Sequence, residues 1–330
     1  MRQPPLRHLS RQPRRRQHGA ALLMAMIILT LVATLAAGMM YQQDRAIRVE
    51  AAERAHEQTA RVARGALEMA RWILRRDTVS SAATDHLGEG WATRLPETEL
   101  SSLIAGNDRS PTEQPVMRAF VRGGITDVQG RLNLYNLVTD KNELDPLQHN
   151  ALRRLCSNAG LPAEMADRIA EGLLRAWSQQ AVQPDAAVAP VHLSQLSWLG
   201  VEPGAIKALR PWVDILPVRT PLNINTAPAM VLSAALNIDI GSAQRLEQER
   251  SRSPGNKGFE NTARITEILG KEVLEKNPIA LDVKSNWFEV DASLRIGDEY
   301  TRQAWLLERT PRTVVVRREE RRALDETFGS

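Results

Sequence analysis

The sequence predicts an α+β protein in which a long N-terminal helix packs on an antiparallel sheet that is interrupted by a large all-helical insert. Three observations lead to this fold class. Residues 20–41 form an uncharged apolar run. Residues 287–296 alternate between apolar and polar side chains, as in a half-buried strand. Between these two segments, residues 145–269 carry helical periodicity broken by prolines and glycines.

The apolar run is long enough to cross a membrane. Ala20–Tyr41 holds about 22 residues without charge, and a helix needs about 20 to span the bilayer core. The preceding residues 1–19 contain six arginines and no acid, which predicts a cytoplasmic N-terminus and an exported C-terminal part. We therefore expect a single-pass inner-membrane protein with a periplasmic domain.

The boundary between the basic segment and the apolar run is itself informative. Gly19 directly precedes Ala20 at the start of the run, an arrangement that resembles the leader of type IV prepilins. This resemblance implies cleavage between Gly19 and Ala20 by a prepilin peptidase, which leaves the span in the mature chain. An uncleaved signal anchor is the alternative. A secretory signal has a shorter apolar region, and Ala36-Ala37-Gly38 offers only a weak cleavage site.

The net charge argues against a nucleic-acid-binding surface. The 330-residue chain has a formal charge of +4, from 43 basic and 39 acidic residues, but the leader alone contributes +6. The remaining 37 basic and 39 acidic residues give −2, so the basic character is a topology signal. Cys156 is the only cysteine, which excludes an intrachain disulfide and makes a buried structural thiol the default expectation.

The helix is expected to continue past the membrane for about 55 residues in all. No proline occurs between Ala20 and Leu95, and only Gly38 and Gly65 interrupt the pattern, at about 1 kcal/mol each. One apolar face continues beyond the span, with members at Val62, Ala66, Met69, Ala70, Ile73 and Leu74. A span followed by a separate helix is the alternative.

The sheet is expected from one strand before the helical segment and three after it. Residues 78–115 are read as a loop, and residues 116–125 as the first strand. The three later strands are a meander over 287–296, 300–309 and 314–317. The predicted domains are a leader (1–19), a transmembrane segment (20–41), a discontinuous sheet domain (42–140 and 285–317), a helical insert (141–284) and a charged tail (318–330).

Several motifs, taken in order, resemble the K-type minor pseudopilins of type II secretion systems. They lie at Asp85–Trp91, Asp127–Leu137, Pro221–Ala227 and Trp287–Val290, in addition to Gly19-Ala20. The resemblance implies a minor pseudopilin at the tip of the pseudopilus, which helps to initiate assembly and to control pseudopilus length. It also implies the I-, J- and H-type minor pseudopilins as partners.

Two positions bear on this resemblance. Met24 is position five of the expected mature chain, where most pilins have Glu and the K-type family lacks it; a carboxylate at that depth is costly without a partner. The family also carries an acidic stretch in the insert that is associated with calcium. Here the matching residues are Ala176-Trp177-Ser178-Gln179-Gln180, and the short loop after them holds only Asp185, whereas calcium sites need several carboxylates. We therefore expect no cofactor, with calcium as the alternative that the resemblance implies.

Two other classes of function were weighed. Residues 223–252 also resemble a helix-hairpin-helix module, so a membrane-anchored nucleic-acid-binding protein is the alternative. Its hairpin holds a single glycine, Gly241, and an acidic residue, Asp239, where backbone amides must face phosphate. An enzyme is not expected. The six histidines are widely separated, and H-E-x-x-H, G-x-S-x-G and P-loop motifs are absent from the sequence.

Overall fold

The computed structural model describes residues 18–80, 83–99, 119–178, 188–253, 257–296 and 299–322. The chain divides into two compact units, one up to Gln58 and one from Thr59 onward, and each is described by itself. Residues 1–17 of the predicted leader, and the end of the predicted tail beyond Arg322, lie outside the described residues.

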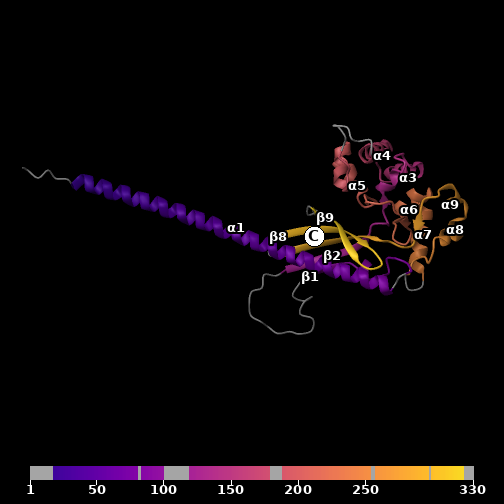
Figure 1. Ribbon diagram of the computed structural model, residues 1–330, viewed down its shortest axis with the longest axis horizontal. Coiled ribbons are helices and arrows are strands. Elements are labelled where there is room, and N and C mark those ends of the chain that lie inside the picture. Colours follow the sequence, from indigo (N-terminus) through magenta and orange to yellow (C-terminus); the bar gives the residue numbers. More distant parts are fainter. Residues whose placement is uncertain are drawn as a thin grey trace, which may run out of the picture. The chain divides into compact units, whose positions relative to one another are not determined.

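The first unit consists of the N-terminal part of helix α1, which runs from His18 to Ser80 (Figure 1). Its apolar residues are exposed, as Met24 (62%) and Leu29 (73%) illustrate, and the helix is long and apolar enough to cross a membrane. After the apolar run, Asp44 pairs with Arg48 at i,i+4. The predicted long helix is confirmed, and its 63 residues exceed the expected 55 because nothing breaks the helix before Ser80.

In the second unit, residues 59–80 of α1 cover one face of a five-stranded antiparallel sheet. The strands are β1 (Leu95–Glu99), β2 (Ala119–Asp127), β7 (Trp287–Ile296), β8 (Glu299–Arg309) and β9 (Val314–Arg322), and they lie in that order across the sheet. Buried Ala63, Leu67 and Leu74 of α1 pack in one core with side chains such as Val290 and Leu307. The predicted combination of helix and antiparallel sheet is confirmed.

Two strands differ from the prediction. β1 lies in the segment read as a loop, because its sequence, LPETE, shows no apolar alternation; Pro96 is tolerated since β1 is an edge strand. β9 continues to Arg322, so the first five residues of the predicted charged tail belong to the sheet. Their charges fit there because Arg318 and Arg322 meet buried carboxylates, as described below.

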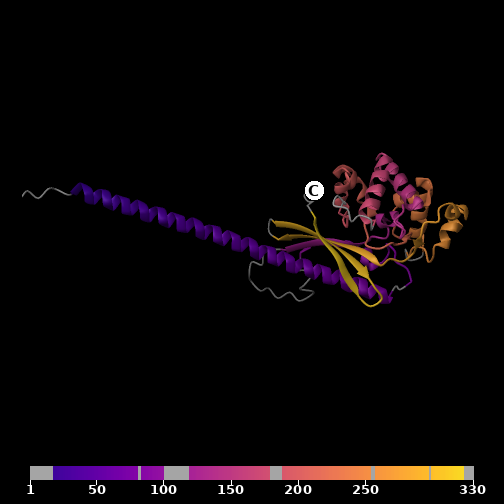
Figure 2. The same ribbon diagram turned by 45° about the horizontal axis from the view of Figure 1, so that its top comes forward.

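The chain leaves the sheet after Asp127 and returns at Trp287, and the helices of the insert gather at that end of the sheet (Figures 1 and 2). This excursion is longer than the predicted 141–284, because Leu132, Leu134 and Leu137 already belong to the insert's core. The helices are α3 (Pro146–Asn158), α4 (Glu164–Trp177), α5 (Pro203–Leu209), α6 (Ala229–Leu236), α7 (Ile240–Arg252), α8 (Ala263–Leu269) and α9 (Glu272–Lys276). The 3-10 helices are η1 (Gly90–Ala92), η2 (Leu134–Leu137) and η3 (Leu193–Leu199).

The insert has its own apolar core and local signals that begin its helices. Asp145 caps α3 by accepting hydrogen bonds from the backbone N–H groups of Leu147 and Gln148, and Pro146 occupies the first turn. Two short parallel pairs tie the insert's irregular segments together: β3 (Leu132–Asn133) with β4 (Val213–Asp214), and β5 (Leu222–Asn223) with β6 (Leu281–Asp282). Cys156 is fully buried in this core, and burial raises the pKa of its thiol to about 11, so it is a structural residue.

Candidate functional site at the junction of sheet and insert

Asp127 is the centre of the junction between the sheet and the insert. It ends β2, is fully buried, and its Oδ2 accepts hydrogen bonds from three side chains: Thr226 Oγ1 (2.5 Å), Ser285 Oγ (2.6 Å) and Asn223 Nδ2 (2.9 Å). Its Oδ1 accepts one from the backbone N–H of Gln129 (2.8 Å). Burial raises the pKa of Asp127 to about 6, while the hydroxyls of Ser285 and Thr226 act in the opposite direction by stabilising the charged form.

Asn223 joins three separate segments at the same place. Its Nδ2 lies within hydrogen-bonding distance of Asp127 Oδ2, the backbone oxygen of Asp85 (3.1 Å) and Ser285 Oγ (2.9 Å). Its backbone N–H donates to the carbonyl of Gln129. Because the side chain is completely buried, each of these contacts stabilises the junction in a low-dielectric environment.

Gly130 shows how closely the segments approach. A Cβ at this position would lie 2.7 Å from Thr226 Oγ1 and 3.0 Å from the backbone carbonyl carbon of Thr226. Gly130 of the Asp127–Leu137 motif is therefore required by close packing against the segment Asn223–Ala227.

Arg309, the last residue of β8, connects the junction to the end of α1. Its Nη1 donates to Asp77 Oδ2 (2.7 Å), and its Nη2 donates to Asp85 Oδ1 (2.5 Å) and to the backbone oxygen of Ser285 (2.7 Å). The guanidinium carbon also lies 4.6 Å from the ring centroid of Phe288. Burial raises the pKa of Asp77, and Arg309 counters that effect.

The loop between α1 and β1 places a third carboxylate beside Asp77 and Asp85. Glu89 Oε2 accepts hydrogen bonds from Trp91 Nε1 (2.5 Å) and the backbone N–H of His86 (3.2 Å). Trp91 in turn packs edge-on against Phe288, with ring centroids 5.2 Å apart. Burial raises the pKa of Glu89 to about 7, and the charges of Asp77 and Asp85 act in the same direction.

A second buried ionic cluster holds β9 to the insert. Arg131 contacts Asp214 (3.1 Å) and Glu289 (3.6 Å), Arg318 contacts Asp214 (3.2 Å), and Arg322 donates to Glu289 (2.6 Å). Burial alone would raise the pKa of Glu289, but Arg131 and Arg322 hold it at about 2. Because three arginines share two carboxylates, residues 318–322 of the predicted tail are held in a strand of the sheet.

Most of the motif segments of the sequence analysis therefore converge on one place. Asp85–Trp91, Asp127–Leu137, Pro221–Ala227 and Trp287–Val290 all contribute to the junction or to the clusters beside it. Sequence reasoning missed Arg309, Ser285, Arg318 and Arg322, because isolated arginines and serines at strand ends carry no local signal. The side chains named here are buried and bound to one another, so the arrangement fixes two parts of a fold rather than exposing a reactive group.

The predicted site residues at the N-terminus lie in the first unit and are not part of this junction. α1 begins at His18, so Gly19 and Ala20 fall in its first turn, and Met24 lies one turn further on with its side chain exposed. The stretch considered for calcium ends α4, where Trp177 packs against Tyr135 with centroids 5.1 Å apart. Gln179, Gln180 and Asp185 lie outside the described residues.

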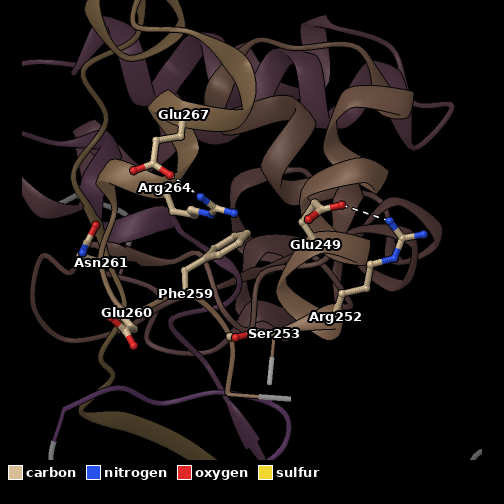
Figure 3. Close-up of a pocket in the computed structure, with 9 residues that line it drawn as sticks. Glu249, Arg252, Ser253, Phe259, Glu260, Asn261, Arg264 and Glu267 are labelled. Carbon is tan, nitrogen blue, oxygen red and sulfur yellow. Dashed lines mark hydrogen bonds and ion pairs between the residues drawn. The ribbon is translucent and has the colours of Figure 1, made fainter. Parts of the chain in front are cut away.

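A polar pocket of about 430 Å³ lies between α7 and α8, beside Phe259 (Figure 3). Its two arginines pair with glutamates of their own helices, Arg252 with Glu249 and Arg264 with Glu267, and Glu260 adds a further acid. This surplus of carboxylates disfavours a phosphate ligand.

In the segment that resembles a helix-hairpin-helix module, the groups that would bind a phosphate bind other parts of the insert instead. Asp239 caps α7 and accepts the backbone N–H of Ser242 (2.9 Å), which a phosphate would otherwise bind. Arg250 is buried and donates to the backbone oxygens of Ile224 (2.9 Å) and Ala227 (2.5 Å). Both residues therefore serve the packing of the insert.

Comparison with known families gives two matches, both described as type II secretion system protein K. One family model covers residues 130–218 and the other covers residues 222–284, so together they span most of the insert.

Known proteins resemble the chain over most of its length. The type II secretion system protein K of Pseudomonas aeruginosa is 28% identical over 308 residues, covering 86% of each protein. That of Pectobacterium carotovorum is 28% identical over 319 residues, covering 89% of this chain and 93% of the relative. A chain in the crystal structure of the GspK–GspI–GspJ complex of enterotoxigenic Escherichia coli matches with a TM-score of 0.64 and 19% identity, over 83% of this chain and 99% of that chain; this likeness concerns the fold.

The long apolar N-terminal helix, the sheet that the end of this helix covers, and the inserted helical body give the chain the fold of a chain in the GspK–GspI–GspJ complex. The two family models and the curated relatives agree on one description, type II secretion system protein K, which is a structural component of a secretion machine, and the chain resembles these relatives over 86–92% of its length. The alternative, a membrane-anchored helix-hairpin-helix protein, finds no support in these comparisons.

Proposed function

We propose that this protein is the minor pseudopilin at the tip of a type II secretion pseudopilus, where it helps to initiate assembly and to control pseudopilus length for export across the outer membrane. The observation that carries the proposal is the match to protein K over both halves of the insert. An inserted body of this size favours a tip position, because a subunit stacked above it would have to accommodate the whole body. The protein acts by helix packing and not by chemistry on a substrate.

The N-terminal helix has two roles in this proposal. The arginine-rich leader keeps the N-terminus cytoplasmic and the rest of the chain periplasmic. After a prepilin peptidase removes residues 1–19, the apolar run holds the subunit in the inner membrane and then packs into the pseudopilus. Met24 supports a tip role because its thioether needs no charged partner, whereas a Glu at this depth would need one.

The partners follow from the same proposal. The solved structure of similar fold is that of the GspK–GspI–GspJ complex. We expect this chain to bind the corresponding I- and J-type minor pseudopilins and to be joined by the H-type.

Cleavage after Gly19 can be tested with two glycine variants. Gly19→Val should leave the leader attached, since the peptidase requires the small residue before the cut. Gly38→Val is the matched control: it lies at the far end of the apolar run, where nothing lies within 4 Å of an added Cβ, and should be processed normally. N-terminal sequencing of the membrane-bound protein distinguishes the cases. A mature chain that begins after Gly38 would establish a secretory signal instead.

The tip role can be tested by co-purification of the chain from Asp44 onward with its I- and J-type partners. We expect a stoichiometric complex of the three proteins. In the control, this chain and the J-type partner are mixed without the I-type partner, and a doubled amount of this chain should not form the complex. Antibody labelling of intact pseudopili should mark one end. Labelling repeated along the shaft would contradict a tip position even if the complex forms.

A further inference from the structure

The carboxyl cluster of Asp77, Asp85 and Glu89 brings three acids together, and Arg309 is the arginine that pairs with them among the described residues. One oxygen from each of the three lies within 4.8 Å of the others. Arg309 pairs with two of them, Asp77 and Asp85, whereas the ionic contact of Glu89 among the described residues is to His86, which pairs only when the imidazole is protonated. The cluster therefore carries excess negative charge when all three acids are ionised.

The second carboxylate oxygen of Glu89 accepts no hydrogen bond from the residues that the structure describes. Oε2 holds both Trp91 and the backbone of His86, but Oε1 is buried and unpaired, and the glutamate side chain is only 5% exposed. The nearest cationic candidate is His86, with Nε2 3.8 Å from Oε1. A buried carboxylate oxygen without a donor is costly, and a proton on that oxygen removes the charge that burial penalises.

We propose that Glu89 is a proton-binding site at neutral pH, and that the proton on its Oε1 secures the loop between α1 and the sheet against the junction. In the protonated state Glu89 removes one negative charge from the cluster, whose carboxylate oxygens lie within 4.8 Å of one another. The junction is then held more firmly in a mildly acidic medium than in an alkaline one.

A divalent metal ion is the competing occupant of such a cluster. Arg309 disfavours it, because its guanidinium already lies at hydrogen-bonding distance from Asp77 and Asp85 and is held there by Ser285 and Phe288. Asp85 also accepts the backbone N–H of Ser285 at its Oδ2 (2.8 Å). The proton requires no rearrangement of these contacts.

The sign of the pH dependence follows from the direction of the shift. The pKa of Glu89 is raised by burial to about 7 in the folded protein, so its stabilising contribution is complete below the unfolded value and is lost as the pH rises through 7. Two buried histidines oppose it below about pH 6.5, because burial lowers the pKa of His86 and of His192. The charge of Lys257 also lowers the pKa of His86. The charged groups that face Glu89 from neighbouring elements are Asp85 of the loop and Arg309 of β8.

The test compares the Tm of the wild-type full chain with that of Glu89→Gln, both in detergent, over a range of pH. Both proteins contain the same histidines, so the histidine contributions cancel in the difference. The glutamine keeps an acceptor for Trp91 and places an N–H₂ group at the unpaired position. We expect Glu89→Gln to have a higher Tm than the wild type at about pH 8.5. Between about pH 8.5 and pH 6 the folding equilibrium constant of the wild type should rise roughly tenfold relative to that of the variant, which narrows the difference in Tm by about 2–5 °C. Glu68→Gln, an exposed acid of α1, is the control and should show a constant difference.

Two further measurements distinguish a bound proton from a bound metal ion. Asp77→Asn removes a negative charge that raises the pKa of Glu89. The pH at which the stability falls should therefore be lower in this variant than in the wild type. Millimolar Ca²⁺ added after EDTA treatment should leave Tm unchanged at alkaline pH. A Glu89→Gln difference that is independent of pH overturns the proposal, and a calcium-dependent rise that Glu89→Gln abolishes would replace the proton by a metal.

Discussion

Replacing Arg309 by methionine is expected to lower the free energy of unfolding by about 3–5 kcal/mol, because it leaves two buried carboxylates without their cation. The Arg309 side chain is 9% exposed, and those of Asp77 and Asp85 are 10% and 2% exposed, so water cannot replace the lost contacts. Methionine fills much of the same volume and keeps the apolar contact with Phe288, so the loss measures mainly the charge and its hydrogen bonds. Urea unfolding of the full chain, followed by near-ultraviolet circular dichroism, measures the change.

Arg317→Met is the matched control for this substitution. Arg317 lies on β9 and pairs with Glu308, but its side chain is 50% exposed, so its loss should cost less than about 1 kcal/mol. Arg309→Lys should fall between the two, since an ammonium group cannot reproduce the fork that contacts both acids. Equal losses for Arg309→Met and Arg317→Met would mean that the buried pairing does not support the fold.

The parts of the fold that could be predicted from the sequence are those with a strong local period. The long N-terminal helix follows from the charge-free run, the absence of proline after it and the apolar spacing beyond it, and the strand over Trp287–Ile296 follows from period-two alternation. β1 could not be predicted, because LPETE has neither pattern and is a strand only through its pairing with β2. For β9, residues Arg318–Arg322 read as a solvated tail until Asp214 and Glu289 are placed beside them.

In the candidate site, too, some residues could be predicted from the sequence and others could not. Asp127 and Asn223 could be selected from the sequence because they lie in motifs that resemble a known family. Their partners could not, since Ser285 is 158 residues from Asp127 and Arg309 is 232 residues from Asp77 along the chain. A motif therefore indicated which residues matter, whereas only the three-dimensional arrangement shows that they join two bodies.

Asp127→Ala is expected to cost at least about 3 kcal/mol of folding free energy and to loosen the insert from the sheet. Four donors lose a hydrogen bond at once, those of Thr226, Ser285, Asn223 and the Gln129 backbone. Asn223 keeps its contacts with Asp85 and Ser285, but each buried group that is left unpaired costs about 1–3 kcal/mol. Asp127→Asn should restore only part of the loss, because its amide nitrogen would face donors where an acceptor is required. Asp140→Ala, at an exposed acid of the same region, is the control.

The manner of unfolding distinguishes a joint from ordinary core packing. The insert has an apolar core of its own, separate from the core between α1 and the sheet, so it can remain folded when the junction opens. In Asp127→Ala we expect two thermal transitions in place of one, and protease cleavage within residues 128–131 and 283–286 that releases the insert as a stable fragment. A single transition at lower temperature, with cleavage spread through the insert, would contradict the role of Asp127 as the residue that joins the two bodies.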